Sequence, residues 1–132
     1  MTAEESKKMK VLFVDDDKLL LTQTQIFLQR SEHDFKVDTA RNVSEAFDLM
    51  KETEYDAIIS DYKMEERDGL DLLKAIRKND ENMPFIMFTG KGNERVAQDA
   101  LNLGANRYIR KRGDARSQYD NLAEALVEEI EK

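Results

Sequence analysis

The sequence has no cysteine and only one histidine, His33. The lack of cysteine excludes disulfides, thiolate metal sites and a cysteine nucleophile. No apolar run approaches the roughly 20 residues that span a bilayer, and the polar residues 1–8 contain no signal-peptide core. A net charge of −7 argues against a general nucleic-acid binder, because phosphate contacts need a basic face. We therefore expect a cytoplasmic protein that binds neither membranes nor nucleic acid.

The length of 132 residues suits one domain with a continuous core. Charged residues make up 37% of the chain and hydrophobic residues 40%, which is typical of a globular protein with a heavily solvated surface. No internal repeat or linker interrupts the sequence. We interpret residues 1–9 as a flexible leader and residues 10–132 as the domain.

Short apolar or alternating segments and helical patterns follow one another five times. This rhythm predicts an α/β fold with a parallel sheet covered on both faces, the (βα)5 arrangement. Right-handed crossovers leave few topologies, and the flavodoxin-like strand order 2-1-3-4-5 is the natural one at this size. The predicted strands are 11–14, 35–40, 85–88 and 107–110, with a further buried strand in the run 55–61 around its apolar residues 57–59. The predicted helices include 18–30, 93–103 and 117–130.

Acidic residues follow two of the buried strands. Asp15 and Asp16 come directly after strand 11–14, and Asp61 ends the run 55–61 that contains the other buried strand. In the predicted order these strands are neighbours at the switch point of the sheet, so the three side chains should converge. Three ionised carboxylates need a cation to offset their repulsion. With oxygen ligands only, the site suits Mg²⁺ or Mn²⁺.

Two further polar residues end the last two strands. Thr89 offers a hydroxyl after strand 85–88, and Lys111 offers an ammonium group after strand 107–110. A metal, a hydroxyl and an ammonium group around one carboxylate are the groups that stabilise phosphoryl transfer. Asp61 stands alone at its strand end and is the best candidate for the nucleophile of an aspartyl-phosphate reaction.

The spacing of these motifs resembles the receiver domains of two-component response regulators, the CheY-like branch of this fold. The resemblance covers residues 10 to about 130, and no single motif carries it alone. The stretch 88–94 is most similar to receivers of archaeal signalling proteins. The matching residues are Val14-Asp15-Asp16, Asp61 with Met64 and Asp68-Gly69, Phe88-Thr89-Gly90, and Gly104-Ala105 with Tyr108 and Lys111.

The resemblance implies that Asp61 accepts a phosphoryl group from a histidine kinase or a phosphotransfer domain. It implies that Asp16 binds Mg²⁺ directly, Asp15 binds it largely through water, and the backbone carbonyl of Lys63 completes the protein ligands. The domain would catalyse only its own phosphorylation and dephosphorylation, so we do not expect a multiple-turnover enzyme.

The resemblance also implies a switch. Thr89 would swing to the phosphoryl group, Lys111 would pair with it, and Tyr108 would turn inward. The surface made by the fourth helix, fifth strand and fifth helix would change as a result. We expect a monomer or a phosphorylation-dependent dimer, with an output or kinase domain as a candidate continuation beyond Lys132.

Four residues near the site raise separate points. Lys63 and Lys91 occupy positions that tune phosphoryl lifetime in the family, and we expect them to prolong it. Glu65 and Arg112 stand where the family commonly has proline. A cis peptide without proline costs about 2.5–4 kcal/mol, so the geometry of the Lys111 loop is left open here.

Other interpretations of these residues are open at this point. Asp15 and Asp16 could be helix-capping acids, Thr89 and Tyr108 ordinary strand residues, and Lys111 a surface lysine. Two other functions compete with phosphorylation-based signalling. One is a vestigial receiver that interacts without phosphorylation. The other is a small Mg-dependent aspartyl-phosphate hydrolase, which is disfavoured because the residues after Asp61 lack the second acid of an Asp-x-Asp motif.

Overall fold

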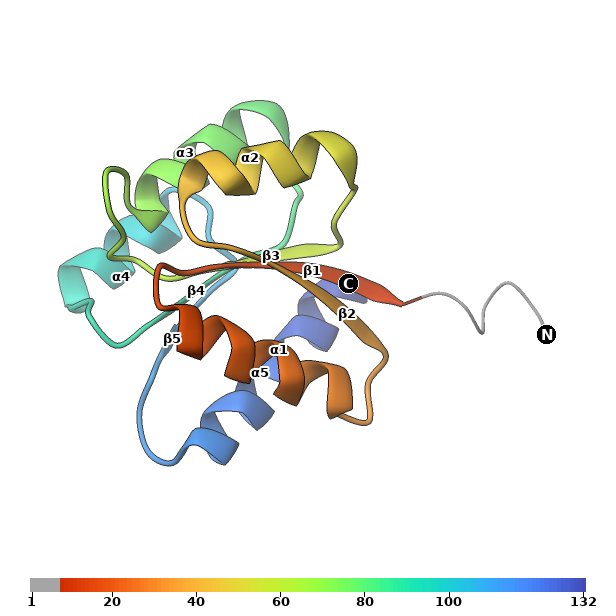
Figure 1. Ribbon diagram of the computed structural model, residues 1–132. Helices are drawn as coiled ribbons and strands as arrows, with labels where there is room; N and C mark the ends of the chain where they lie inside the picture. The colour runs from red at the N-terminus through yellow and green to blue at the C-terminus, as the bar shows by residue number, and fades with distance from the viewer. Residues whose placement is uncertain (1–7) are drawn as a thin grey trace.

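The computed structural model describes residues 8–132 and contains five parallel strands that alternate with five helices (Figure 1). The strand order is β2-β1-β3-β4-β5, which confirms the predicted flavodoxin-like topology. Within residues 8–132, no helix combines the length and apolar character needed to cross a bilayer. The elements are β1 Met9–Val14, α1 Lys18–Arg30, β2 Phe35–Ala40, α2 Val43–Glu52, β3 Ala57–Ser60, α3 Gly69–Asn79, β4 Phe85–Thr89, α4 Glu94–Asn102, β5 Arg107–Arg110 and α5 Ala115–Ile130.

Helices cover both faces of the sheet. Figure 1 shows α1 and α5 on one face and α2, α3 and α4 on the other. Each face has its own apolar cluster, because successive side chains of a strand point to opposite faces. Phe13 and Phe88 face α1 and α5, while Leu12 and Met87 face the other three helices.

The central and edge strands differ in burial as their sequences predict. All four residues of β3 and all five of β4 are buried, which is typical of strands covered on both faces. β2 lies at an edge of the sheet and alternates between buried and exposed positions. The half-exposed edge strand predicted for residues 35–40 is therefore confirmed.

Side-chain caps decide where several helices begin. Residues 42–45 have the sequence spacing of a capping box, and Asn42 accepts a hydrogen bond from the N–H of Glu45 at 2.8 Å. Glu45 reaches back to the N–H of Arg41 rather than to Asn42, so the capping box is incomplete. α5 begins at Ala115, two residues before the predicted start, because Asp114 accepts the N–H of Ser117 at 2.7 Å.

The predicted leader overlaps the first strand. Residues 1–7 lie outside the described part of the chain, so most of the leader prediction is not tested. Met9, however, already belongs to β1, because its N–H donates to the carbonyl of Asp34 at 2.8 Å. The strand therefore begins two residues before the predicted position 11.

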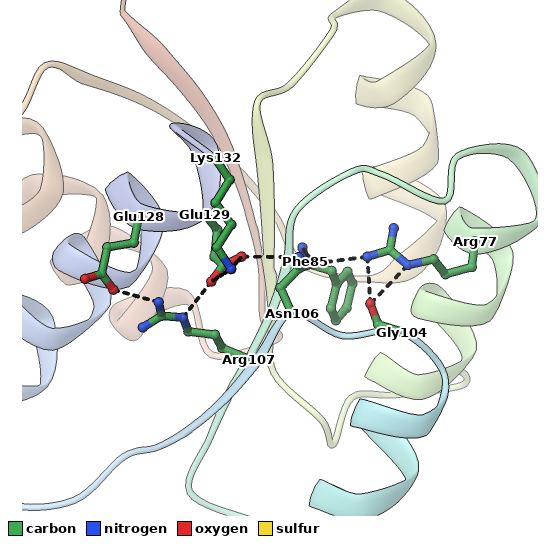
Figure 2. Close-up of polar contacts among 8 residues, drawn as sticks. All are labelled: Arg77, Phe85, Gly104, Asn106, Arg107, Glu128, Glu129 and Lys132. Atoms are coloured by element: carbon green, nitrogen blue, oxygen red, sulfur yellow. Dashed lines mark hydrogen bonds and ion pairs between the residues drawn. The ribbon is translucent and has the colours of Figure 1, made fainter.

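A polar network joins α3, β4, β5 and α5 at the end of the sheet where β4 and β5 begin (Figure 2). Asn106 and Phe85 exchange hydrogen bonds: the Asn106 carboxamide oxygen accepts the N–H of Phe85 at 2.9 Å, and the N–H of Asn106 donates to the carbonyl of Phe85 at 2.8 Å. The same carboxamide accepts from Arg77 of α3 and donates to Glu129 of α5. Arg77 also donates to the carbonyl of Gly104 at 2.8 and 3.1 Å.

Glu129 is the buried acid of this network. Its side chain is only 3% exposed and accepts a 2.9 Å hydrogen bond from Arg107, at the start of β5. Burial raises the pKa of Glu129, but hydrogen bonds from Arg107 and Lys132 outweigh this effect and hold the pKa below its ordinary value. The ionised form therefore stabilises the fold at neutral pH, and this contribution is lost as the pH falls through the lowered pKa.

We predict that Asn106→Ala lowers the free energy of unfolding by about 1–3 kcal/mol, because it leaves the N–H of Phe85 without a partner. The matched control is Asn102→Ala, at the end of α4. Asn102 is exposed and makes no side-chain hydrogen bond within residues 8–132. Urea unfolding of the control should stay within about 0.5 kcal/mol of the parent. Equal losses in the two variants would contradict the role given to Asn106.

Candidate functional site

The predicted acidic residues converge where β1 and β3 end. The register pairs Val14 with Ser60, and the N–H of Asp61 donates to the carbonyl of Val14 at 2.9 Å. One carboxylate oxygen from each of Asp15, Asp16 and Asp61 lies within 4.8 Å of the other two. The convergence predicted from the strand order is confirmed.

Asp15 is almost completely buried and both of its oxygens are engaged. One accepts the N–H of Asp17 at 2.9 Å, and the other accepts the ammonium group of Lys111 at 3.1 Å. Burial raises the pKa of Asp15, and the nearby charge of Asp61 adds to this effect, whereas the Asp17 N–H and Lys111 act against it. Ionisation of the Asp15 side chain is therefore unfavourable relative to a solvated carboxylate, and a neighbouring cation would make it more favourable.

Asp61 is 3% exposed and leaves one oxygen uncommitted. Its Oδ1 accepts the N–H of Tyr62 at 2.8 Å, whereas Oδ2 makes no hydrogen bond within residues 8–132. Asp16, by contrast, is exposed at the rim. The site thus combines one buried carboxylate with a free oxygen, one buried carboxylate paired with lysine, and one solvated carboxylate.

The donor set fits a hard divalent cation. All three side chains offer carboxylate oxygens, and their separation matches a shared ion. The carbonyl of Lys63, on the loop after β3, accepts no hydrogen bond in the described part of the chain and is available as a further ligand. The cluster of Asp15, Asp16 and Asp61 could therefore hold a metal ion.

Asp17, the third acid of the run, has a different role. It caps α1 by accepting the N–H of Leu20 at 3.2 Å. Its side chain is not part of the three-carboxylate cluster. Helix capping, considered above for Asp15 and Asp16, is the role of Asp17.

Thr89 ends β4 and is fully buried. Its hydroxyl oxygen accepts the N–H of Lys91 at 3.0 Å, and its carbonyl accepts the N–H of Lys111 at 3.1 Å. The hydroxyl proton takes part in no hydrogen bond within residues 8–132, so it is available to a ligand in the site. Thr89 therefore connects the loop after β4 with the end of β5.

Lys111 reaches the site although its loop lacks the proline that is common in the family. No peptide bond in residues 8–132 is cis, so the bond between Lys111 and Arg112 is trans. The ammonium group nevertheless lies 3.1 Å from Asp15 Oδ2 and 5.2 Å from the centre of the Phe88 ring. Its side chain is 16% exposed, which distinguishes it from an ordinary surface lysine.

Tyr108 is half-buried on β5, and its hydroxyl is shielded from solvent without a hydrogen-bond partner in residues 8–132. Burial raises the pKa of the phenol, the charge of Arg110 opposes this effect, and that of Asp61 reinforces it. The hydroxyl oxygen occupies space that a Cβ atom on Gly92 would fill, and the strand-end argument did not select Gly92. Lys63 and Lys91 lie on the loops after β3 and β4 with exposed side chains.

Fold and site together define a doubly wound α/β protein with an acidic cluster at its strand ends that could hold a metal ion. The sequence model of the response regulator receiver domain matches residues 11–123. A chemotaxis protein CheY homolog of Campylobacter jejuni is 38% identical over 106 residues, which are 78% of this chain and 81% of that protein. The chain therefore belongs to the receiver domain family of two-component response regulators, and phosphorylation-based signalling is its expected function.

Other relatives differ in length. The sensory transduction protein LytR of Staphylococcus saprophyticus is 35% identical over 103 residues, 78% of this chain but only 40% of that protein. A crystal structure of a response regulator receiver domain protein from Clostridium thermocellum has a TM-score of 0.82 at 29% identity, covering 92% of this chain and 94% of the other. The chain thus matches both receiver-sized proteins and one part of longer regulators.

If the three acids bind a divalent cation, adding Mg²⁺ will raise the free energy of unfolding of the parent chain, by about 2.7 kcal/mol at 100 times the dissociation constant. Asp16→Asn should lose most of this gain. The control Asp17→Asn should keep it, because asparagine still caps α1. Thermal unfolding with and without Mg²⁺ measures the difference. An equal gain in Asp16→Asn and the parent would remove Asp16 from the site.

Proposed function

We propose that Asp61 accepts a phosphoryl group from the phosphohistidine of a histidine kinase or phosphotransfer domain. In the reaction the free Oδ2 forms a bond to phosphorus as the bond between phosphorus and the donor histidine nitrogen breaks. The released imidazole takes up a proton. The observation that carries this proposal is the position of Asp61, buried at a strand end with one uncommitted oxygen inside the acidic cluster.

A divalent cation, Mg²⁺ or Mn²⁺, would supply positive charge beside the phosphoryl oxygens. Asp16 is proposed to hold it directly, Asp15 largely through water, and Asp61 and the Lys63 carbonyl as the remaining ligands. The hydrogen bonds that already occupy both oxygens of Asp15 support its indirect role.

Lys111 and Thr89 are proposed to bind the phosphoryl group. Lys111 would exchange its contact with Asp15 for the oxygens of a phosphoryl group on the neighbouring Asp61. Thr89 would donate its free hydroxyl proton and give up the N–H of Lys91. Thr89 also accepts a hydrogen bond from Lys111 at the end of β5. Its movement would therefore change the position of Tyr108 and the surface formed by α4, β5 and α5. That surface would then act on a partner, or on an output domain of the same protein.

The first test is phosphorylation by acetyl phosphate in the presence of Mg²⁺. We expect the intact mass to increase by one phosphoryl group in the parent and not in Asp61→Asn, which removes the nucleophilic carboxylate. Stable incorporation supports the signalling domain. Continuous release of phosphate would indicate a hydrolase, and no incorporation at all would refute the proposal.

The second test concerns the phosphoryl lifetime. Lys63→Ala and Lys91→Ala should each shorten the half-life of phosphorylated Asp61 by at least about threefold, equivalent to roughly 0.6 kcal/mol of barrier. The reason is that an ammonium group beside the phosphoryl group would hold it and hinder attacking water. Lys78→Ala, an exposed lysine near the end of α3, serves as the control. Unchanged half-lives in both site variants would show that neither Lys63 nor Lys91 prolongs the phosphoryl lifetime.

A further inference from the structure

The hydroxyl of Tyr108 occupies an unusual environment. It is shielded from solvent and has no hydrogen-bond partner within residues 8–132. Buried hydroxyls are almost always paired, because losing water without gaining another partner is unfavourable. Shape complementarity, not a polar contact, must therefore hold the ring in its inward position.

Gly92, on the loop after β4, supplies the complementary shape. A Cβ atom placed on Gly92 would overlap with the Tyr108 hydroxyl oxygen, and would lie 3.0 Å from Tyr108 Cζ and 3.4 Å from the methyl carbon of Thr89. The φ angle of Gly92 is outside the left-handed region, so an alanine could adopt its backbone conformation. Glycine is needed here for space and not for backbone freedom.

The loop that carries Gly92 is also connected to the site. The carbonyl of Gly92 accepts a 3.4 Å hydrogen bond from Arg110 of β5, and the N–H of Lys91 donates to the Thr89 hydroxyl at 3.0 Å. The Thr89 methyl group already lies beside the space that Tyr108 fills. A rotation of Thr89 toward the phosphoryl group would release Lys91 and displace this methyl group. The packing of the Tyr108 ring would therefore depend on whether Asp61 carries a phosphoryl group.

We infer that Gly92 is a positioning residue for Tyr108, and that its missing side chain admits the ring to the inward position. The inference deepens the proposed function, because it rests on Tyr108 being the switch residue. It assigns to Gly92 the packing of Tyr108 that is already present in the unmodified chain, and no part in the phosphoryl transfer. Any side chain at position 92 would keep Tyr108 outside while Asp61 stays competent.

The test uses the full chain labelled with 3-fluorotyrosine, with the Tyr108 resonance assigned by its loss in Tyr108→Phe. A soluble paramagnetic agent broadens exposed rings and spares buried ones. We expect the Tyr108 resonance to be protected in the parent and broadened in Gly92→Ala. Gly90→Ala is the matched control on the same loop, since a Cβ there would meet only Lys111 Cβ, at an ordinary 3.7 Å. Its Tyr108 resonance should stay protected.

A double-mutant cycle separates steric exclusion from general damage to the loop. If the added methyl group acts through Tyr108, Gly92→Ala will lower the unfolding midpoint in the parent and not in the Tyr108→Ala background. An equal loss in both backgrounds would overturn the inference. So would a Tyr108 resonance that remains protected in Gly92→Ala, or one that becomes equally broadened in Gly90→Ala.

The response to phosphorylation is then measured with acetyl phosphate and Mg²⁺. Gly92→Ala should take up phosphoryl groups at the parent rate while Tyr108 stays exposed. A Tyr108 ring that becomes protected on phosphorylation of the variant would refute the inference. Failure of the parent to take up phosphoryl groups would refute the proposed function instead, and the exposure of Tyr108 in the unmodified chain would still decide the role of Gly92.

Discussion

The structure depends on holding the carboxylates of Asp15 and Asp61 together against their mutual repulsion. The parallel pairing of β1 with β3 places them side by side, through the hydrogen bond from the Asp61 N–H to Val14. Both strands are buried on their two faces, and each fully buried Ile or Val side chain contributes about 1.5–3 kcal/mol. Apolar packing in the sheet therefore opposes the electrostatic repulsion at its edge. The ammonium group of Lys111 offsets part of that repulsion and leaves a deficit of positive charge for a cation to fill.

Sequence reasoning predicted the parts of this molecule that follow from local pattern and strand topology. Residues 18–30 and 35–40 are a helix and a strand with the predicted bounds, because hydrophobic periodicity and burial agree there. The acidic cluster was predicted for a similar reason, since carboxyl ends of adjacent parallel strands share one edge. The starts of β1 and α5 were missed by two residues each. They depend on a backbone bond to Asp34 and on the cap by Asp114, which add no apolar residue to the pattern.

Local sequence pattern could not predict specific contacts between side chains that are distant in the sequence. Lys111 was expected at the site, but its pairing with Asp15, 96 residues away, depends on how its long side chain lies over Phe88. The role of Gly92 follows from a space that exists only once Tyr108 is packed. The link from Asn106 to Glu129 likewise requires α5 to dock beside β5. A glycine or an asparagine in a loop has an ordinary explanation from turn chemistry, so the sequence offers no signal for these roles.

The two ends of β5 explain how a change at the site could reach the surface. The strand has only four residues and a single neighbour in the sheet, β4. Its start is tied to α5 through Arg107 and the buried Glu129, far from the site, whereas its end leads to Lys111 and the acidic cluster. A strand held at its start would not slide as a whole if Lys111 exchanged Asp15 for a phosphoryl group, as proposed. The displacement must instead be absorbed near Tyr108, whose hydroxyl makes no hydrogen bond in residues 8–132 that would resist it. Tyr108 lies between the anchored start of β5 and its end at the acidic cluster, and only packing holds its side chain in place. Among the residues of β5, its side chain is therefore best able to adopt two positions.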